Sequence, residues 1–182
     1  MVKTNKLKLT LLQQEILSFL FEKAGKSFNA RSLAKNLHFS PPAIAKAIPT
    51  LEKENLITIK KDKESGRLSI EMNRDNRRAT RLKRADNLKS LYESGLVEFL
   101  EDKFSGSTII LFGSYSKGED TITSDLDIAI IGAKEKTLVL EKFEKFLDRE
   151  IRVQFYSSLK EIHKNLRSNI LNGIVLKGGV EI

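Results

Sequence analysis

The segment from residue 107 to residue 132, STIILFGSYSKGEDTITSDLDIAIIG, constrains the fold of this chain more than any other. Thr108 to Phe112 is a β-branched and aromatic run, which predicts a buried strand. It ends in Gly113-Ser114, and after a polar stretch comes a second predicted strand, in which Asp125 and Asp127 alternate with apolar residues. Because side chains alternate along a strand, both carboxylates are expected on one face, about 6.6 Å apart.

This carboxylate pair predicts a metal site. Two carboxylates on one face repel each other, and a buried pair is costly without a cation. No Lys or Arg stands between Asp125 and Asp127 in the sequence, so a divalent metal ion is the natural partner. Mg²⁺ prefers oxygen ligands and typically uses one or two carboxylates together with substrate phosphates. Gly113 lets a phosphate approach the backbone, and Ser114 offers a hydroxyl and an amide at the predicted start of a helix.

The spacing of these residues carries a family resemblance. A hydrophobic residue, Gly-Ser, ten residues and then Asp-Leu-Asp-Ile resembles the nucleotidyltransferase domain of the DNA polymerase beta superfamily. Within that superfamily the segment looks most like the minimal nucleotidyltransferases, which are related to kanamycin nucleotidyltransferase. The pairs Gly118-Glu119 and Ser124-Asp125 match that subgroup's habit in this loop. The resemblance spans about residues 90–182.

The resemblance implies roles for five residues. Gly113 and Ser114 would bind a nucleoside triphosphate such as ATP, and Asp125 and Asp127 would be catalytic and hold Mg²⁺ or Mn²⁺. Lys117 stands where the subgroup often has Arg, which implies a contact with the triphosphate. The implied reaction transfers a nucleoside monophosphate to an acceptor hydroxyl and releases pyrophosphate.

Active relatives normally supply a third carboxylate from the strand that 151–156 should form. The polar face of this predicted strand offers Arg152 and Gln154, and the expected acid most resembles Gln154. Glu150 shares that face but lies four residues back, about 13 Å away along an extended strand. We therefore expect nucleotide binding with weak intrinsic transfer.

The N-terminal part shows a different pattern, which changes from a helical period to a period of two. It predicts a helix that ends near Ala24-Gly25, a short helix capped by Asn29, and a third helix that starts at Ser40-Pro41. Two strands, 56–61 and 68–72, follow with a turn between them. This is the order of a winged helix-turn-helix, and the stretch from Asn29 to Ile59 resembles the MarR-like winged-helix families.

That resemblance implies a contact with duplex DNA. Residues 1–74 hold 14 Lys/Arg against 7 Asp/Glu, a net charge of +7, which suits a polyanionic partner. Pro49, inside the third helix, should kink or shorten it. An alternative is that this domain contacts a protein, since its lysines could form an ordinary solvated face. The side chains expected at DNA are Lys46, Thr50 and Lys53 on the third helix, and Lys60, Lys61, Lys63 and Arg67 on the hairpin.

The predicted fold class is α+β, with a winged helix-turn-helix domain, a helical connector and a small mixed-sheet nucleotidyltransferase domain. We place the first domain at 1–74, a basic linker helix at 75–92 and the nucleotidyltransferase domain at 85–182, with a helix break around Gly95. The linker carries a basic cluster, which could extend the nucleic-acid surface, approach the phosphates of a nucleotide, or form a solvated helix face. Its residues are Arg77, Arg78, Arg81, Lys83 and Arg84.

Composition narrows the alternatives. The chain has no Cys and only two His, which excludes disulfides, thiolate metal sites and Cys nucleophiles and disfavours His-built metal sites. No apolar run approaches the roughly 20 residues of a membrane span, so a cytoplasmic protein without a membrane partner is expected.

Three functions fit this sequence. The first is an Mg²⁺-dependent nucleotidyltransferase that also binds DNA. The second is a DNA-binding transcriptional regulator whose nucleotidyltransferase domain senses nucleotide or is catalytically impaired. The third is an antitoxin-like partner of a helical toxin, which would then be the protein acceptor. The habits of winged helices suggest a homodimer.

Overall fold

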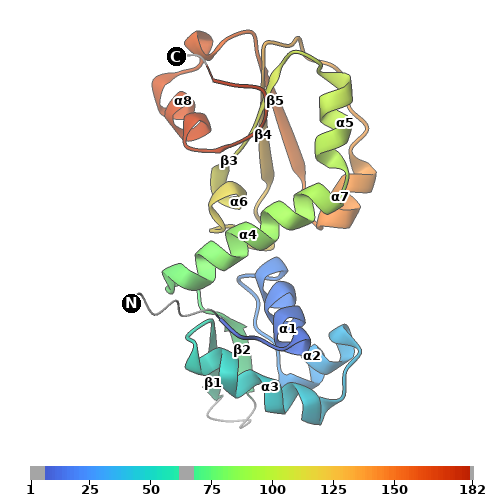
Figure 1. The fold of residues 1–182 in the computed structure, drawn as a ribbon, viewed down its shortest axis with the longest axis vertical. Helices are drawn as coiled ribbons and strands as arrows, with labels where there is room; N and C mark the ends of the chain where they lie inside the picture. Colours follow the sequence, from blue (N-terminus) through green and yellow to red (C-terminus); the bar gives the residue numbers. More distant parts are fainter. Residues whose placement is uncertain (1–6, 62–67, 181–182) are drawn as a thin grey trace. The chain divides into compact units, whose positions relative to one another are not determined.

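A computed structural model describes residues 7–61 and 68–180 of the chain. The chain divides into two compact units, Met1–Ala79 and Thr80–Ile182, and the boundary falls inside helix α4 (Arg77–Glu93). The predicted α+β class, with a helical N-terminal part and a mixed sheet in the C-terminal part, is confirmed (Figure 1). Lys63 and Arg67, which were predicted to contact DNA, lie outside the described residues.

The first unit has the element order of a winged helix-turn-helix. Strands β1 and β2 pair as an antiparallel hairpin, and an isolated bridge joins Phe28 to Ile70 of β2. The core is formed by buried side chains from all three helices and from the hairpin. The elements are α1 (Leu11–Glu22), α2 (Ala30–Leu37), α3 (Pro41–Lys53), β1 (Ile57–Lys61) and β2 (Leu68–Met72).

Side-chain caps start the two helices of the helix-turn-helix, as predicted. The Asn29 side chain accepts from the Ser32 amide at 2.8 Å, and the Ser40 hydroxyl accepts from the Ala43 amide. Pro49, which is expected to kink or shorten α3, does not shorten it, because the helix continues to Lys53. Pro49 is exposed, so its ring lies on the outer face and the helix gives up one amide donor without disturbing the core.

The second unit is built around a four-stranded mixed sheet with the strand order β5-β4-β3-β6. Strand β3 pairs antiparallel with both β4 and β6, whereas β4 and β5 are parallel. The break between α4 and α5 falls at Gly95, as predicted. The remaining elements are α5 (Leu96–Lys103), β3 (Thr108–Phe112), α6 (Gly113–Lys117), β4 (Leu126–Ile131), α7 (Glu141–Leu147), β5 (Ile151–Tyr156), a 3-10 turn (Leu159–Glu161), α8 (Lys164–Leu171) and β6 (Ile174–Lys177).

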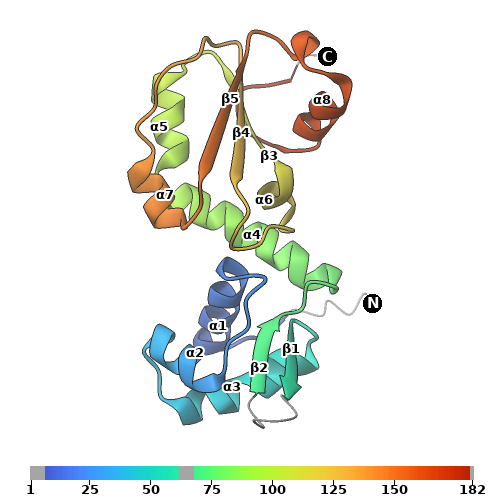
Figure 2. The same ribbon diagram turned by 180° about the vertical axis from the view of Figure 1, so that it is seen from behind.

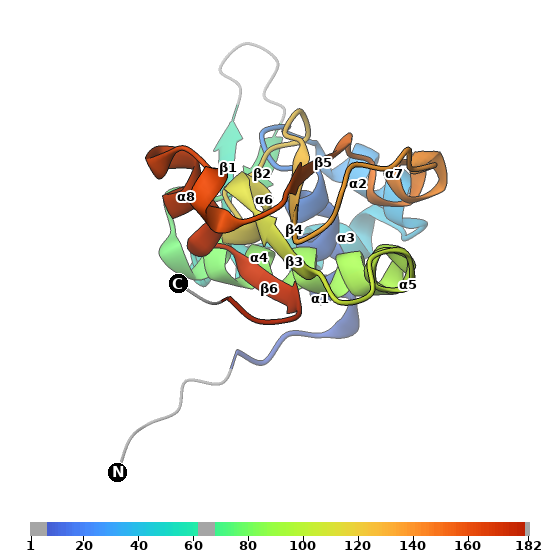
Figure 3. The ribbon, with the colours of Figure 1, turned by 90° about the horizontal axis from the view of Figure 1, so that it is seen from above.

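Helices cover both faces of this sheet. The alternate residues Ile109, Leu111 and Ile128 pack with α4, α5 and α7 in the larger core. The opposite face contributes Ile110 and Ala129 to a smaller core with α8. Figures 2 and 3 show α5 and α8 on opposite sides of the sheet. None of the helices in the two described ranges is long and apolar enough to cross a membrane.

Candidate functional site

Asp125 and Asp127 lie where β4 begins, on the face of the sheet that α8 covers. Asp125 directly precedes the strand, and Asp127 pairs with Phe112 at the end of β3. Leu126 and Ile128, which alternate with them, point into the larger core. The predicted placement of both carboxylates on one face therefore agrees with the structure, and the end of β3 lies beside them.

Gly113 makes this arrangement sterically feasible. The residue follows β3 directly, has a φ of +74°, and starts the short helix α6. A Cβ atom at Gly113 would overlap the Asp127 carboxylate, so only glycine fits this position without displacing the acid. The Ser116 hydroxyl donates to the Gly113 carbonyl at 2.8 Å and holds the turn. The Gly113 backbone thus lies close to the Asp127 carboxylate.

The electrostatics of the pair favour a bound cation. Burial raises the pKa of Asp127, the negative charge of Asp125 raises it further, and Arg152 acts in the opposite direction. Ionising both acids therefore costs free energy in the cation-free fold, and a positive charge placed between them would recover that cost. The donor set, two carboxylates on one face, suits a hard divalent cation.

Arg152 is the nearest positive charge in the described structure. In the parallel pairing of β4 and β5 it stands opposite Asp127, and its Nη1 lies 2.9 Å from Asp125 Oδ2. Gln154 instead pairs with Ala129 and accepts a hydrogen bond from the Tyr156 hydroxyl at 2.6 Å. Gln154 lies on the same face as Arg152, two residues further along β5, and its match to the third acid of active relatives stays a prediction.

Other groups border the site. Lys117, at the end of α6, has its ammonium 3.4 Å from the Asn169 side chain of α8. Asp125 also lines an open pocket of about 430 Å³, which Glu144 and Glu150 help to form. Within residues 7–61 and 68–180, no group of three or more acids and histidines is arranged to hold a metal ion.

A buried ion network, which the sequence analysis missed, anchors the loop that leads to Asp125. The Asp120 carboxylate accepts hydrogen bonds from Asn87 Nδ2 at 2.7 Å and from Lys83 Nζ at 2.9 Å. Arg149 Nη2 lies 3.4 Å from Asp120 Oδ2. The side chains of Lys83 and Asp120 are 1% and 0% exposed. Burial lowers the pKa of Lys83 despite the adjacent carboxylate. The network ties α4, the loop after α6 and the turn before β5 to one another.

Lys83 was interpreted as part of an exposed or phosphate-contacting basic cluster, and that interpretation is wrong. The buried positions of α4 are Ala79, Lys83, Asn87 and Leu91, which recur every four residues. This spacing is the signal that could have identified Lys83 as an inward-facing residue. The α4 backbone also approaches Gly118 so closely that a Cβ there would overlap the Thr80 carbonyl.

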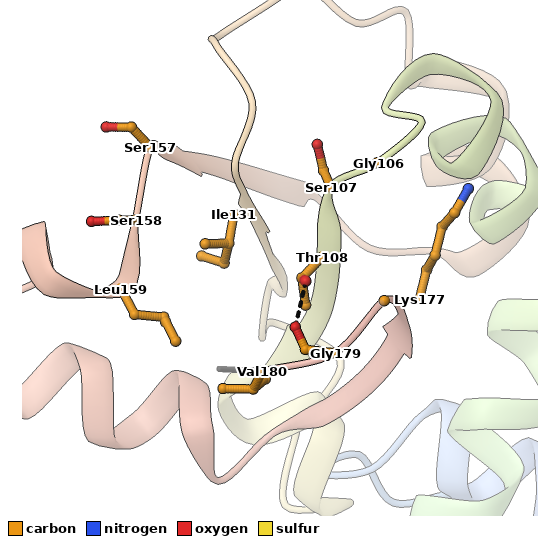
Figure 4. A pocket seen from close by; sticks show the side chains of 11 residues that line it. Gly106, Ser107, Thr108, Ile131, Ser157, Ser158, Leu159, Lys177, Gly179 and Val180 are labelled. Atoms are coloured by element: carbon orange, nitrogen blue, oxygen red, sulfur yellow. Dashed lines mark hydrogen bonds between the residues drawn. The ribbon is translucent and has the colours of Figure 1, made fainter. Parts of the chain in front are cut away.

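A second pocket, of about 610 Å³, lies on the same face at the other end of the strands (Figure 4). Its lining includes Thr108 and Ile131, which are paired four residues away from the Phe112–Asp127 pair. This separation is about 13 Å along a strand. The Thr108 hydroxyl donates to the Gly179 carbonyl at 2.7 Å across one wall. None of the predicted site residues lines this pocket.

The five predicted DNA-contacting residues that the structure describes share one property, exposure. Lys46, Thr50 and Lys53 lie on the exposed side of α3, opposite its buried residues. Lys60 and Lys61 are exposed on β1, but Lys60 is already paired with Glu71 at 2.8 Å. Among the described residues, Lys46, Lys53 and Lys61 have no ion-pair partner, and Thr50 adds an exposed hydroxyl.

Comparison with protein families identifies the second part of the chain. Residues 93–177 match the family model described as the nucleotidyltransferase domain. The matched residues include the Gly113-Ser114 pair, Asp125 and Asp127. A comparison with curated proteins found no match.

Solved structures similar to this chain include a repressor and a transcription regulator. The adhesin competence repressor AdcR from Streptococcus pyogenes is 25% identical, with 57% of this chain and 72% of that chain covered and a TM-score of 0.43. A mutant of Lactococcus lactis ZitR is 22% identical, with 56% of this chain and 66% of that chain covered and a TM-score of 0.42. MepR, a transcription regulator of the Staphylococcus aureus multidrug efflux pump MepA, is 20% identical, with 54% and 68% covered and a TM-score of 0.40. At such TM-scores, the winged-helix assignment rests on the element order of the first unit.

Proposed function

We propose that this chain is a DNA-binding regulator whose nucleotidyltransferase domain binds a nucleoside triphosphate together with a divalent cation. The observation that carries the proposal is the contact between the Gly113 backbone and the Asp127 carboxylate, with Asp125 on the same face. This arrangement lies inside the residues that match the nucleotidyltransferase family. A glycine backbone beside a carboxylate pair suits a ligand that brings phosphates and a cation together.

Each residue of the site has a role in this proposal. Asp125 and Asp127 hold the cation, which neutralises the phosphate oxygens when it is bound. Gly113 and Ser114 contact the phosphates, because a missing Cβ leaves the backbone amides accessible. Lys117 adds a positive charge at the end of α6, where its long side chain can leave Asn169 for the triphosphate.

A thermal-shift titration of the full chain tests the nucleotide part of the proposal. The melting temperature should rise with an NTP only when Mg²⁺ or Mn²⁺ is present, because a ligand that binds the folded state stabilises it. Asp125→Asn with Asp127→Asn should abolish this rise. Asp102→Asn with Glu135→Gln, two exposed acids of the same unit, is the charge-matched control. A rise that survives in the double Asn variant contradicts the proposal.

The exposed face of α3 supports the DNA part of the proposal. Lys46, Thr50 and Lys53 are exposed on one side of the second helix of the helix-turn-helix, which is the helix that enters the major groove in such domains. The net charge of +7 in residues 1–74 provides attraction to phosphates. Lys61 extends this positive surface onto the hairpin.

Salt dependence tests this DNA contact in the full chain. Affinity for a fluorescent duplex should fall steeply with salt, and Lys46→Ala with Lys53→Ala should reduce the slope of log K against log salt by about 2. Lys8→Ala with Lys26→Ala removes two exposed charges outside α3 and serves as the control. Equal slopes for both double variants contradict a contact through α3.

The family match favours a second candidate function, transfer of a nucleoside monophosphate to an acceptor hydroxyl. The full chain should be incubated with each labelled NTP and Mg²⁺, alone and with cell extract. Label transferred to an acceptor at a rate that depends on Asp125 and Asp127 supports this second function. Binding without transferred label supports the regulator.

A further inference from the structure

Arg152 gives the carboxylate pair a positive charge supplied by the chain itself. Its guanidinium lies 2.9 Å from Asp125 and 3.2 Å from Glu150, and its backbone pairs with Asp127 in the parallel register of β4 and β5. The strand pairing sets this position, because residues opposite each other on one face of a sheet have their side chains in contact range. The guanidinium therefore lies at the carboxylate pair in the described structure.

The charges at the site decide how many divalent cations it can hold. Asp125, Asp127 and Glu150 place three negative charges around the guanidinium, and Arg152 returns one positive charge, so that the chain itself neutralises part of the site before any ligand binds. Two divalent cations a few ångströms apart would need several anionic oxygens besides those of the ligand. Across residues 7–61 and 68–180 no third acid joins the pair to form such a cluster.

We propose that Arg152 takes the place of a second divalent cation, so that the site binds a nucleoside triphosphate with one divalent cation. This inference rests on the proposed function and extends it to the composition of the bound complex. A guanidinium can neutralise phosphate charge through two parallel hydrogen bonds. It does not lower the pKa of an acceptor hydroxyl as a metal ion does. A site of this composition holds nucleotide without activating an acceptor, which suits a regulator.

Counting bound Mn²⁺ tests the inference with a readout other than activity. Free Mn²⁺ is measured by electron paramagnetic resonance while it is titrated into the full chain, first alone and then with ATP and each other NTP. The wild type should bind one Mn²⁺ per nucleotide complex and Arg152→Asp should bind two. Arg152 is 54% exposed, so its replacement should leave the fold intact. Arg152→Gln removes the charge alone, and Lys160→Gln is the control for an exposed cation elsewhere in the unit.

The titration without nucleotide separates this inference from the proposed function. Replacing Arg152 by Asp changes the charge near the cation by two units, so Mn²⁺ binding should tighten by roughly tenfold or more. Lys160→Gln should leave it unchanged. Two Mn²⁺ per complex in the wild type, or unchanged Mn²⁺ affinity in Arg152→Asp, overturns the inference. If the wild type binds none of the NTPs, the proposed function fails, and the metal-only titration still decides the role of Arg152.

Discussion

Replacing Asp120 by Asn should destabilise the Thr80–Ile182 unit strongly, because one carboxylate serves two buried cations. Asp120 Oδ2 lies 2.9 Å from Lys83 Nζ and 3.4 Å from Arg149 Nη2, and the two cationic side chains are 1% and 2% exposed. Asparagine keeps the shape of the side chain but removes its charge. Breaking a buried ion pair by removing one partner typically costs about 3–5 kcal/mol, so we expect a loss of this size in the free energy of unfolding.

Removing Lys83 should cost less than removing Asp120. In Lys83→Met, Asp120 still accepts from Asn87 at 2.7 Å and keeps Arg149 beside it. The variant also removes a buried charge whose pKa is lowered by burial, so part of the desolvation cost disappears with it. We expect a loss of about 1–3 kcal/mol, the cost of leaving hydrogen-bonding capacity unfilled.

The matched control lies on the exposed side of the same helix. Lys89 and Glu93 form an i,i+4 pair at 3.6 Å, with both side chains more than half exposed. Exposed helical pairs of this kind contribute about 0.3–0.5 kcal/mol, so Lys89→Met should change the free energy of unfolding by no more than that.

Tyrosine fluorescence during urea unfolding of the full chain measures these losses. All three tyrosines, Tyr92, Tyr115 and Tyr156, lie in the Thr80–Ile182 unit, and the chain has no tryptophan. The signal therefore reports on the unit that contains the network. The reasoning is refuted if Asp120→Asn costs no more than Lys89→Met, or if Lys83→Met costs more than Asp120→Asn.

Three further predictions concern the candidate site. Asp127→Asn should raise the melting temperature at neutral pH, because the ionised Asp127 carboxylate destabilises the fold. This gain in melting temperature should shrink as the pH falls through the raised pKa of Asp127, and a gain independent of pH contradicts the prediction. Gly113→Ala should abolish the NTP-dependent thermal shift, whereas Gly95→Ala, at the same φ of +74° but with open space around its Cβ, should cost about 1–2 kcal/mol and retain the shift. EDTA should remove the NTP-dependent rise in melting temperature, because the carboxylate pair binds the nucleotide through the cation; a rise that survives EDTA contradicts this.

Local pattern predicted much of this fold. The caps at Asn29 and Ser40, the break at Gly95 and the hairpin of β1 and β2 all agree with the structure. Each depends on interactions between residues a few positions apart, such as a cap side chain and an amide three residues on. Pro49 was the exception, because the packed inner face of α3 outweighs the loss of one hydrogen bond.

The sequence by itself determined that Asp125 and Asp127 share one face beside a Gly-Ser turn, since a period of two is a property of any strand. Only the tertiary structure decided what surrounds them. The register of β4 against β5 places Arg152, and not Gln154, opposite Asp127. Packing of α4 buries Lys83 against Asp120, 37 residues away. Both outcomes depend on long-range pairing and burial, which set the charge of the site and which no local periodicity encodes.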